Sequence, residues 1–94
     1  MDKSELHKQA WIGDAVLELY VRLKILREDG RLDAEKAQSI CSNQFLTAFG
    51  EPTSVEAQIG RAYLEGGIEG AFDWITAHLI PLYERQQEKK RRRA

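Results

Sequence analysis

The sequence contains a single cysteine, two prolines and no long hydrophobic run. One cysteine excludes a disulfide within the chain and is typical of a protein from a reducing compartment. No apolar run approaches the roughly 20 residues of a membrane-spanning helix, and the charged first residues lack the apolar core of a signal peptide. We therefore expect a soluble, cytoplasmic protein that has no membrane partner.

Alternation of apolar and polar residues, the pattern of a half-buried β-strand, is also nearly absent. Apolar residues instead recur at helical spacing along the whole chain. Ninety-four residues, of which 43% are hydrophobic, are enough for one small domain with a modest core. The sequence predicts an all-α, compact domain of four to five helices joined by short loops.

The net charge of −1 conceals a strong asymmetry. Residues 89–93 are all basic and contribute +5, so residues 1–88 carry −6. We therefore divide the chain into a helical domain over residues 1–88 and a basic C-terminal tail over residues 89–94. Such a run is commonly a solvated, disordered tail, but its cations could also contact the phosphates of a nucleic acid.

The first predicted helix is unusually rich in apolar residues. Between Leu6 and Leu26, 13 of 21 residues are apolar, which predicts a central helix packed on several sides. Asp14 lies within this apolar stretch, where its carboxylate needs a cation, hydrogen bonds or open water. Asp14 is either structural, as an N-cap after a break at Gly13 or as a partner of a backbone amide, or it is functional.

Capping residues and glycines set the expected helix boundaries. Asp2 and Asp33 are suited to N-caps, and Gly30 is suited to end the first helix. The first helix should reach about Glu28, the second should run from Asp33 to Gly50, the third from Thr53 to Gly66–Gly67, and the fourth from Ile68 to Pro81. Cys41 lies on the apolar stripe of the second helix, so we expect it to be a packing residue rather than a reactive thiol.

Glu56 has a strong structural alternative to any chemical role. Thr53-x-x-Glu56 has the pattern of a capping box, in which the glutamate bonds back to the amide of the cap residue. On spacing alone, this pattern favours capping over catalysis. Gly60 lies one turn further on, where a missing side chain would let another helix or a ligand approach closely.

Two segments of the chain resemble the acidic motifs of the ribonuclease III family. Ile-Gly-Asp-Ala-Val-Leu-Glu-Leu at 12–19 looks like the signature helix. Val-Glu-Ala-Gln-Ile-Gly at 55–60, followed by Ala-Tyr-Leu-Glu-Gly-Gly at 62–67, looks like the second acidic motif. Both occur in the family's order, and the matched segments cover most of residues 6–80. The Mini-ribonuclease III branch is the most similar, with its Thr-x-x-Glu second motif and no separate double-stranded-RNA-binding domain.

The resemblance implies a ribonuclease-III-like, homodimeric endoribonuclease, a hydrolase that cuts double-stranded or structured RNA with Mg²⁺ or Mn²⁺. Members of the similar branch trim ribosomal RNA precursors. Asp14 and Glu56 would be the catalytic, metal-binding acids, and carboxylates are ligands that suit magnesium. Trp11 would lie in the dimer interface, although its apolar helix also allows it to be a core residue.

The sequence departs from the family pattern at three usually acidic positions, which hold His7, Ala10 and Thr53. Only Glu51-Pro52 stands where the family has a long loop and a further helix. These departures reduce the number of metal ligands and remove a segment that contacts substrate. A second function therefore stays open, namely a catalytically silent ribonuclease-III-like module for dimerisation or RNA docking.

Overall fold

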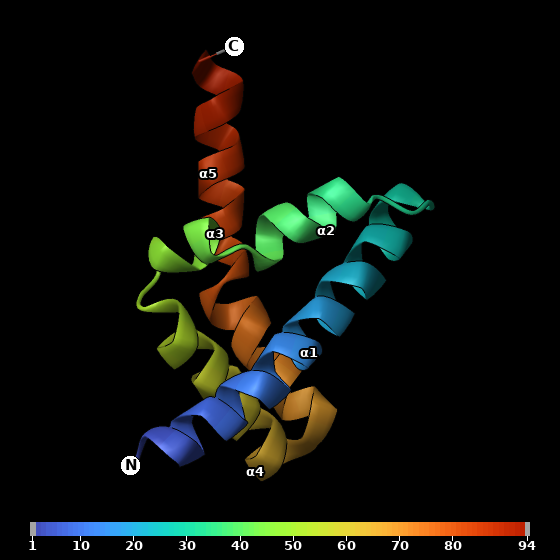
Figure 1. The fold of residues 1–94 in the computed structure, drawn as a ribbon. Helices are drawn as coiled ribbons and strands as arrows, with labels where there is room; N and C mark the ends of the chain where they lie inside the picture. The colour runs from blue at the N-terminus through green and yellow to red at the C-terminus, as the bar shows by residue number, and fades with distance from the viewer. Residues whose placement is uncertain (1, 94) are drawn as a thin grey trace.

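The computed structural model describes residues 2–93, which are almost entirely helical and contain no β-strand. Two short helices lie between the long helices α1 and α4, and α5 follows α4 directly (Figure 1). The elements are α1 (Lys3–Asp29), α2 (Ala34–Cys41), α3 (Asn43–Thr47), α4 (Pro52–His78) and α5 (Ile80–Arg93). The all-α prediction is thereby confirmed. No helix in this range combines the length and the apolar character that crossing a lipid bilayer requires.

α1 begins and ends at the predicted caps. The carboxylate of Asp2 accepts a hydrogen bond of 2.9 Å from the backbone N–H of Glu5. At the other end, Gly30 adopts a left-handed conformation with φ of 71° and donates its N–H to the carbonyl oxygen of Leu26. Each end of the helix therefore has a local residue that bonds to one of its otherwise unpaired backbone groups.

The expectation that α1 is surrounded by the rest of the domain is wrong. One face of α1 is buried, mainly against α4, and includes Leu17 and Val21. The opposite face carries large apolar side chains that remain exposed, namely Trp11 (81%), Leu19 (46%), Leu23 (46%) and Leu26 (45%). The high apolar content thus reflects two apolar faces on opposite sides of one helix, of which only one is covered within this chain.

α1 and α4 cross with their backbones in direct contact, and two glycines permit this approach. A Cβ atom on Gly13 would overlap the carbonyl oxygen of Glu56, and one on Gly60 would overlap the carbonyl oxygen of Gln9. Each helix thus places a glycine against the backbone of the other. This confirms the close approach expected at Gly60 and fixes which residues of the two helices are neighbours.

The second predicted helix is divided at Ser42, which sequence reasoning missed. Ser42 has an extended backbone (φ −71°, ψ 151°), so it ends α2 and caps α3. Its hydroxyl accepts a hydrogen bond from the N–H of Phe45 (3.1 Å) and donates one to the carbonyl oxygen of Ser39 (2.8 Å). A serine that binds nearby backbone groups in this way competes with helical hydrogen bonding. The break turns α3 so that Phe45 and Leu46 enter the core.

The cap of α4 is Glu51, not Thr53 as the sequence suggested. The Glu51 carboxylate accepts hydrogen bonds from the backbone N–H groups of Thr53 (3.1 Å) and Ser54 (2.8 Å), and Pro52 occupies the first turn. These hydrogen bonds, led by the one from Ser54, lower the pKa of Glu51. Because Glu51 caps the helix, the side chain of Glu56 is not engaged in a capping box.

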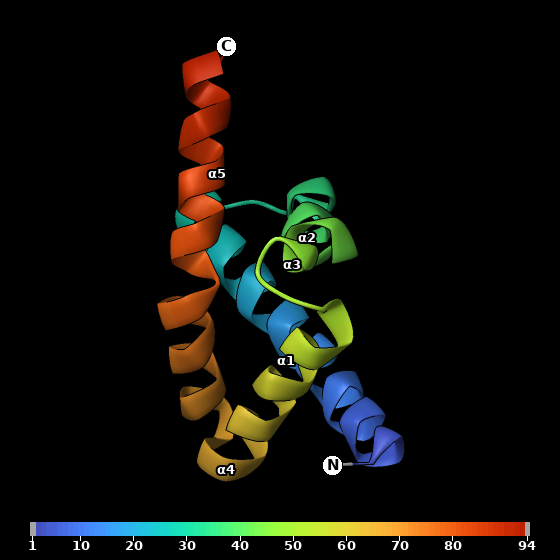
Figure 2. The same cartoon turned by 90° about the vertical axis from the view of Figure 1, so that its left-hand side faces the viewer.

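α4 bends sharply at Gly67, whose angles (φ 68°, ψ −166°) are accessible mainly to glycine. Its two arms form a V in Figure 2, and they correspond to the separate third and fourth helices expected from the sequence. The second arm returns Ile75 to the core beside α1, and the C-cap residue Leu79 is buried with it. α5 then continues as a helix through the basic run to Arg93.

We expect Gly13→Ala and Gly60→Ala each to lower the free energy of unfolding by about 2–3 kcal/mol, because the added methyl group meets backbone atoms that cannot rotate away. Urea denaturation measures this change. Gly66→Ala is the matched control, since its Cβ would have no neighbour within 4 Å. That control should gain up to about 1 kcal/mol from helix propensity. A Gly13→Ala variant with the same free energy of unfolding as the wild type would contradict the close crossing.

Candidate functional site

The helix crossing brings together Asp14 of α1 and Glu56 of α4, the two acids singled out in the sequence. Gly13 packs on the backbone of Glu56, so the residue that follows Gly13 lies beside the Glu56 side chain. The two carboxyl groups are close enough to share a hydrogen bond. Glu56 is half-buried and Asp14 is exposed, so the pair opens to solvent.

Asp14 does not occupy the apolar surroundings that its sequence neighbours suggested. It is exposed because it lies at the edge of α1, between the buried face and the outer apolar face. Gly13 lies inside the helix, so Asp14 is not an N-cap after a break. An exposed side chain is also not a buried partner of a backbone amide. Both structural interpretations of Asp14 are therefore wrong.

The proton affinity of Glu56 reflects this arrangement. Burial is the largest of the effects that raise the pKa of the Glu56 carboxyl to about 7; the hydrogen bond and the negative charge of Asp14 come next, and Glu51 contributes least. Two carboxylates in contact repel each other unless a positive charge lies between them. Near neutral pH a proton supplies this charge, and a divalent cation could take the place of the proton.

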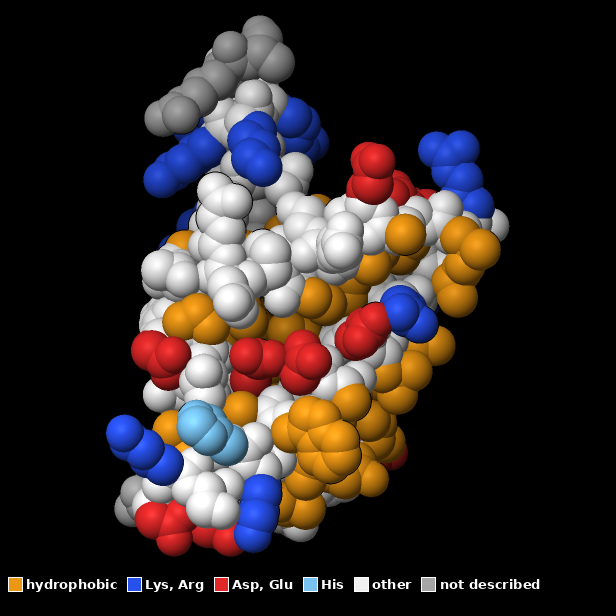
Figure 3. Space-filling view, in the orientation of Figure 1, with side chains coloured by type: hydrophobic (Ala, Val, Ile, Leu, Met, Phe, Trp, Pro, Cys, Tyr) orange, Lys and Arg blue, Asp and Glu red, His pale blue; other side chains and the backbone are white. Residues whose placement is uncertain are grey.

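The acidic pair is part of a larger negative surface. A row of acidic side chains crosses the middle of the face shown in Figure 3. The charges of Glu51 and Asp14 both act on Glu56, and those of Glu18 and Asp14 act on Cys41. Four acids from the two crossing helices and the α4 cap therefore share one region. The sequence analysis did not identify Glu51 as a member of this group. The available signal was its position before Pro52, because proline favours the first turn of a helix and the residue before it is then the cap.

A hollow of about 690 Å³ lies between α1 and α2 and is lined by Glu18, Arg22 and Cys41 among others. Arg22 is ion-paired with Glu18, so this cation is engaged within α1. Burial, followed by the nearby charges of Glu18 and Asp14, raises the pKa of the Cys41 thiol to about 12. The thiol is thus protonated at neutral pH and is not a nucleophile, in agreement with the prediction of a packing residue.

The remaining predicted positions are spread over the surface and core. Trp11 is 81% exposed, so the alternative that it is a core residue is wrong. His7 is exposed, Ala10 is buried and Thr53 is half-buried. Within residues 2–93, no group of three or more His, Cys, Asp or Glu side chains is arranged to hold a metal ion. Any ion at this site would have two carboxylates as protein ligands, a number that magnesium accepts when water completes its shell.

Comparisons of the chain with protein-family models, with characterised proteins and with solved structures find no match. The fold and the acidic pair therefore rest on the sequence and the geometry of this chain.

The raised pKa of Glu56 has a consequence for stability. Between the ordinary value of 4.5 and about 7, the folded protein binds this proton more tightly than the unfolded chain does. The free energy of unfolding should therefore fall as the pH rises through this window. Glu56→Gln removes this dependence, so the variant should gain stability over the wild type as the pH is raised from about 5 to about 8.

Urea denaturation at several pH values measures this difference. Glu65→Gln, which neutralises an exposed acid on the same helix, is the matched control and should keep the pH dependence of the wild type. The same pH dependence in Glu56→Gln and in the wild type would show that folding does not raise the pKa of Glu56.

Proposed function

We propose that this chain is a divalent-metal-dependent endoribonuclease that cuts double-stranded or structured RNA as a homodimer. The observation that carries this proposal is the meeting of Asp14 and Glu56 at a solvent-facing helix crossing. These are the two acids to which the resemblance to the ribonuclease III family gives metal-binding roles. The loss of the capping-box interpretation for Glu56 supports the same view, because Glu51 fulfils that structural task.

The residues present fit a magnesium or manganese ion. The raised pKa of Glu56 means that the pair takes up a positive charge near neutral pH. Asp14 and Glu56 would hold the ion, and the exposure of Asp14 would leave its other positions open to water and to a phosphate. Such an ion lowers the pKa of a bound water and stabilises negative charge on phosphate oxygens.

The chain's own contribution is to hold the two ligands in place. Both carboxylates project from long helices whose backbones touch at Gly13 and Gly60, so little movement is needed before the ligands are in position. Glu51 lies close enough to act on Glu56, and its two backbone hydrogen bonds keep it there. Duplex RNA would be recognised mainly through phosphates and 2′-hydroxyls, and therefore by shape.

The outer face of α1 supports a homodimer. Trp11, Ala15, Leu19 and Leu26 recur at helical spacing along this exposed face, and hydrophobic side chains gather along α1 in Figure 3. An exposed stripe of this kind marks an interaction surface. If the stripe packs against the same stripe of a partner subunit about a two-fold axis, Trp11 of one α1 would lie opposite the Leu26 end of the partner's α1.

The second candidate function is a catalytically silent module for dimerisation or RNA docking. It is favoured by the absence of a third ligating side chain around the pair in the described part of the chain. Metal titration by calorimetry discriminates between the two functions. An endonuclease should bind Mg²⁺ or Mn²⁺ at a site that Glu56→Gln weakens, whereas a silent module should show no such site.

A cleavage assay on long duplex RNA with Mg²⁺ or Mn²⁺ tests the proposed activity. Asp14→Asn and Glu56→Gln should each lower the cleavage rate by at least about 100-fold, since each removes one of two metal ligands. Glu65→Gln should cleave at the wild-type rate, because this exposed acid lies more than two helical turns after Glu56 on α4. No cleavage by the wild type with either metal, or full activity of Asp14→Asn, would overturn the proposal.

Sedimentation velocity tests the proposed dimer. Leu19→Glu places a charge in the middle of the exposed stripe, where dimerisation would bury it without a partner, so this variant should be a monomer. Leu64→Glu is the matched control, because Leu64 is 58% exposed on α4 and lies outside the stripe. A monomeric wild type, or a dimeric Leu19→Glu variant, would exclude this interface.

A further inference from the structure

α5 is anchored at its base only. Ile80 is buried, and the Tyr83 ring packs edge-to-face on Phe45 with their centroids 5.9 Å apart. From Glu88 onward the described side chains of α5 are exposed. In both views the C-terminal end of the helix stands clear of the other elements (Figures 1 and 2). The basic run is therefore carried on a helix that projects from the body.

The projecting end carries cations that the described chain does not neutralise. Arg92 pairs with Glu88 at 2.8 Å, but Lys89, Lys90 and Arg91 have no acidic side chain within 4 Å among the described residues. Lys89 and Arg92 are also three residues apart on the helix, where like charges repel. Residues 1–88 carry a charge of −6, so the positive charge is concentrated at this end.

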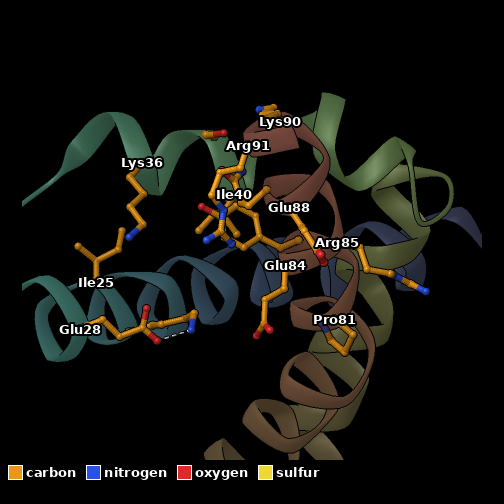
Figure 4. A pocket seen from close by; sticks show the side chains of 14 residues that line it. Ile25, Glu28, Lys36, Ile40, Pro81, Glu84, Arg85, Glu88, Lys90 and Arg91 are labelled. Atoms are coloured by element: carbon orange, nitrogen blue, oxygen red, sulfur yellow. Dashed lines mark hydrogen bonds and ion pairs between the residues drawn. The ribbon is translucent and has the colours of Figure 1, made fainter. Parts of the chain in front are cut away.

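A groove of about 1000 Å³ separates α5 from α1 and α2 (Figure 4). Lys36 of α2 and Arg91 of α5 project into this space from opposite walls. Lys36 is paired with Asp29 at 2.9 Å, and Lys24, deeper in the groove, is paired with Glu28. The inner groove is thus nearly balanced in charge, and the positive excess lies on the outer turns of α5.

We infer that the outer turns of α5 bind the phosphates of the RNA that the acidic pair would cut. This inference rests on the proposed function. Without a metal ion the acidic row at the crossing repels a polyanion, whereas the cations on the outer turns of α5 attract one. Neutralisation by phosphates would also relieve the repulsion between the cations of α5, and it would release counterions from the RNA.

Binding of the full chain to a labelled RNA duplex, measured by fluorescence anisotropy without divalent metal, tests this inference. The variant is Lys89→Gln/Lys90→Gln/Arg91→Gln, since glutamine matches lysine and arginine in helix propensity. The matched control is Lys3→Gln/Arg27→Gln/Arg31→Gln, which removes the same charge from exposed positions outside α5. Circular dichroism checks that both variants keep their helices.

We expect the α5 variant to bind the duplex at least about tenfold more weakly at low salt. The slope of log K against the logarithm of the salt concentration should be shallower by about two to three. The affinity of the control variant should change by less than about threefold. Equal weakening of both variants, unchanged binding by the α5 variant, or tighter binding of the wild type to anionic lipid vesicles than to the duplex would overturn the inference. So would a change of oligomeric state in the α5 variant alone.

The inference and the proposed function fail in different ways. Duplex binding that depends on α5, without any cleavage that depends on Asp14, would overturn the nuclease and keep the phosphate contact. Cleavage that depends on Asp14, together with duplex binding that is indifferent to α5, would overturn the phosphate contact and keep the nuclease.

Discussion

The contact between the backbones of α1 and α4 is the constraint on which the rest of the structure depends. Gly13 packs against the carbonyl of Glu56 and Gly60 packs against that of Gln9, so each of these positions accepts no side chain larger than hydrogen. Contacts between side chains leave room for adjustment, whereas contacts between backbones do not. A hydrogen bond of 2.9 Å between the hydroxyls of Tyr20 and Thr76 ties α1 to the second arm of α4 as well.

This rigid crossing holds two acids together against their mutual repulsion. The pKa of Glu56 is raised first by its burial at the crossing and then by the hydrogen bond and charge of Asp14, so the folded chain holds a carboxyl group where its charged form is disfavoured. An arrangement that reduces stability at neutral pH is easier to understand at a functional site than in a purely structural role. The glycines and the acids therefore form one unit, in which packing positions the charges.

Much of the fold follows from the sequence, because its signals are local. Asp2 and Gly30 cap α1 as their residue types predict, and Asp33 caps α2 by accepting a 3.0 Å hydrogen bond from the N–H of Lys36. Periodicity also gave the all-helical class. The caps depend on residues within one helical turn and the helical class depends on spacing along the chain, so neither depends on tertiary contacts.

The errors arose where two local signals compete or where burial decides. Glu51 and Thr53 can both cap α4, and the position of Pro52 in the first turn gives that task to Glu51. Ser42 can sit inside a helix or break it, and here its hydroxyl binds the backbone instead. The prediction that Asp14 lies beside Glu56 depended on the resemblance to a family, because residue spacing alone does not indicate which helices are in contact.

The bend at Gly67 makes the two arms of α4 neighbours in sequence as well as in space, so this part of the fold needs no long excursion of the chain. The glycine crossing is different, because it joins Gly13 to Glu56 and Gly60 to Gln9, which are far apart in the sequence. The contacts at the crossing can form only after the chain between the two helices has closed into a loop, and loop closure costs entropy. The acidic pair would then exist only in the completed native state, and any reaction carried out there would report that folding had finished.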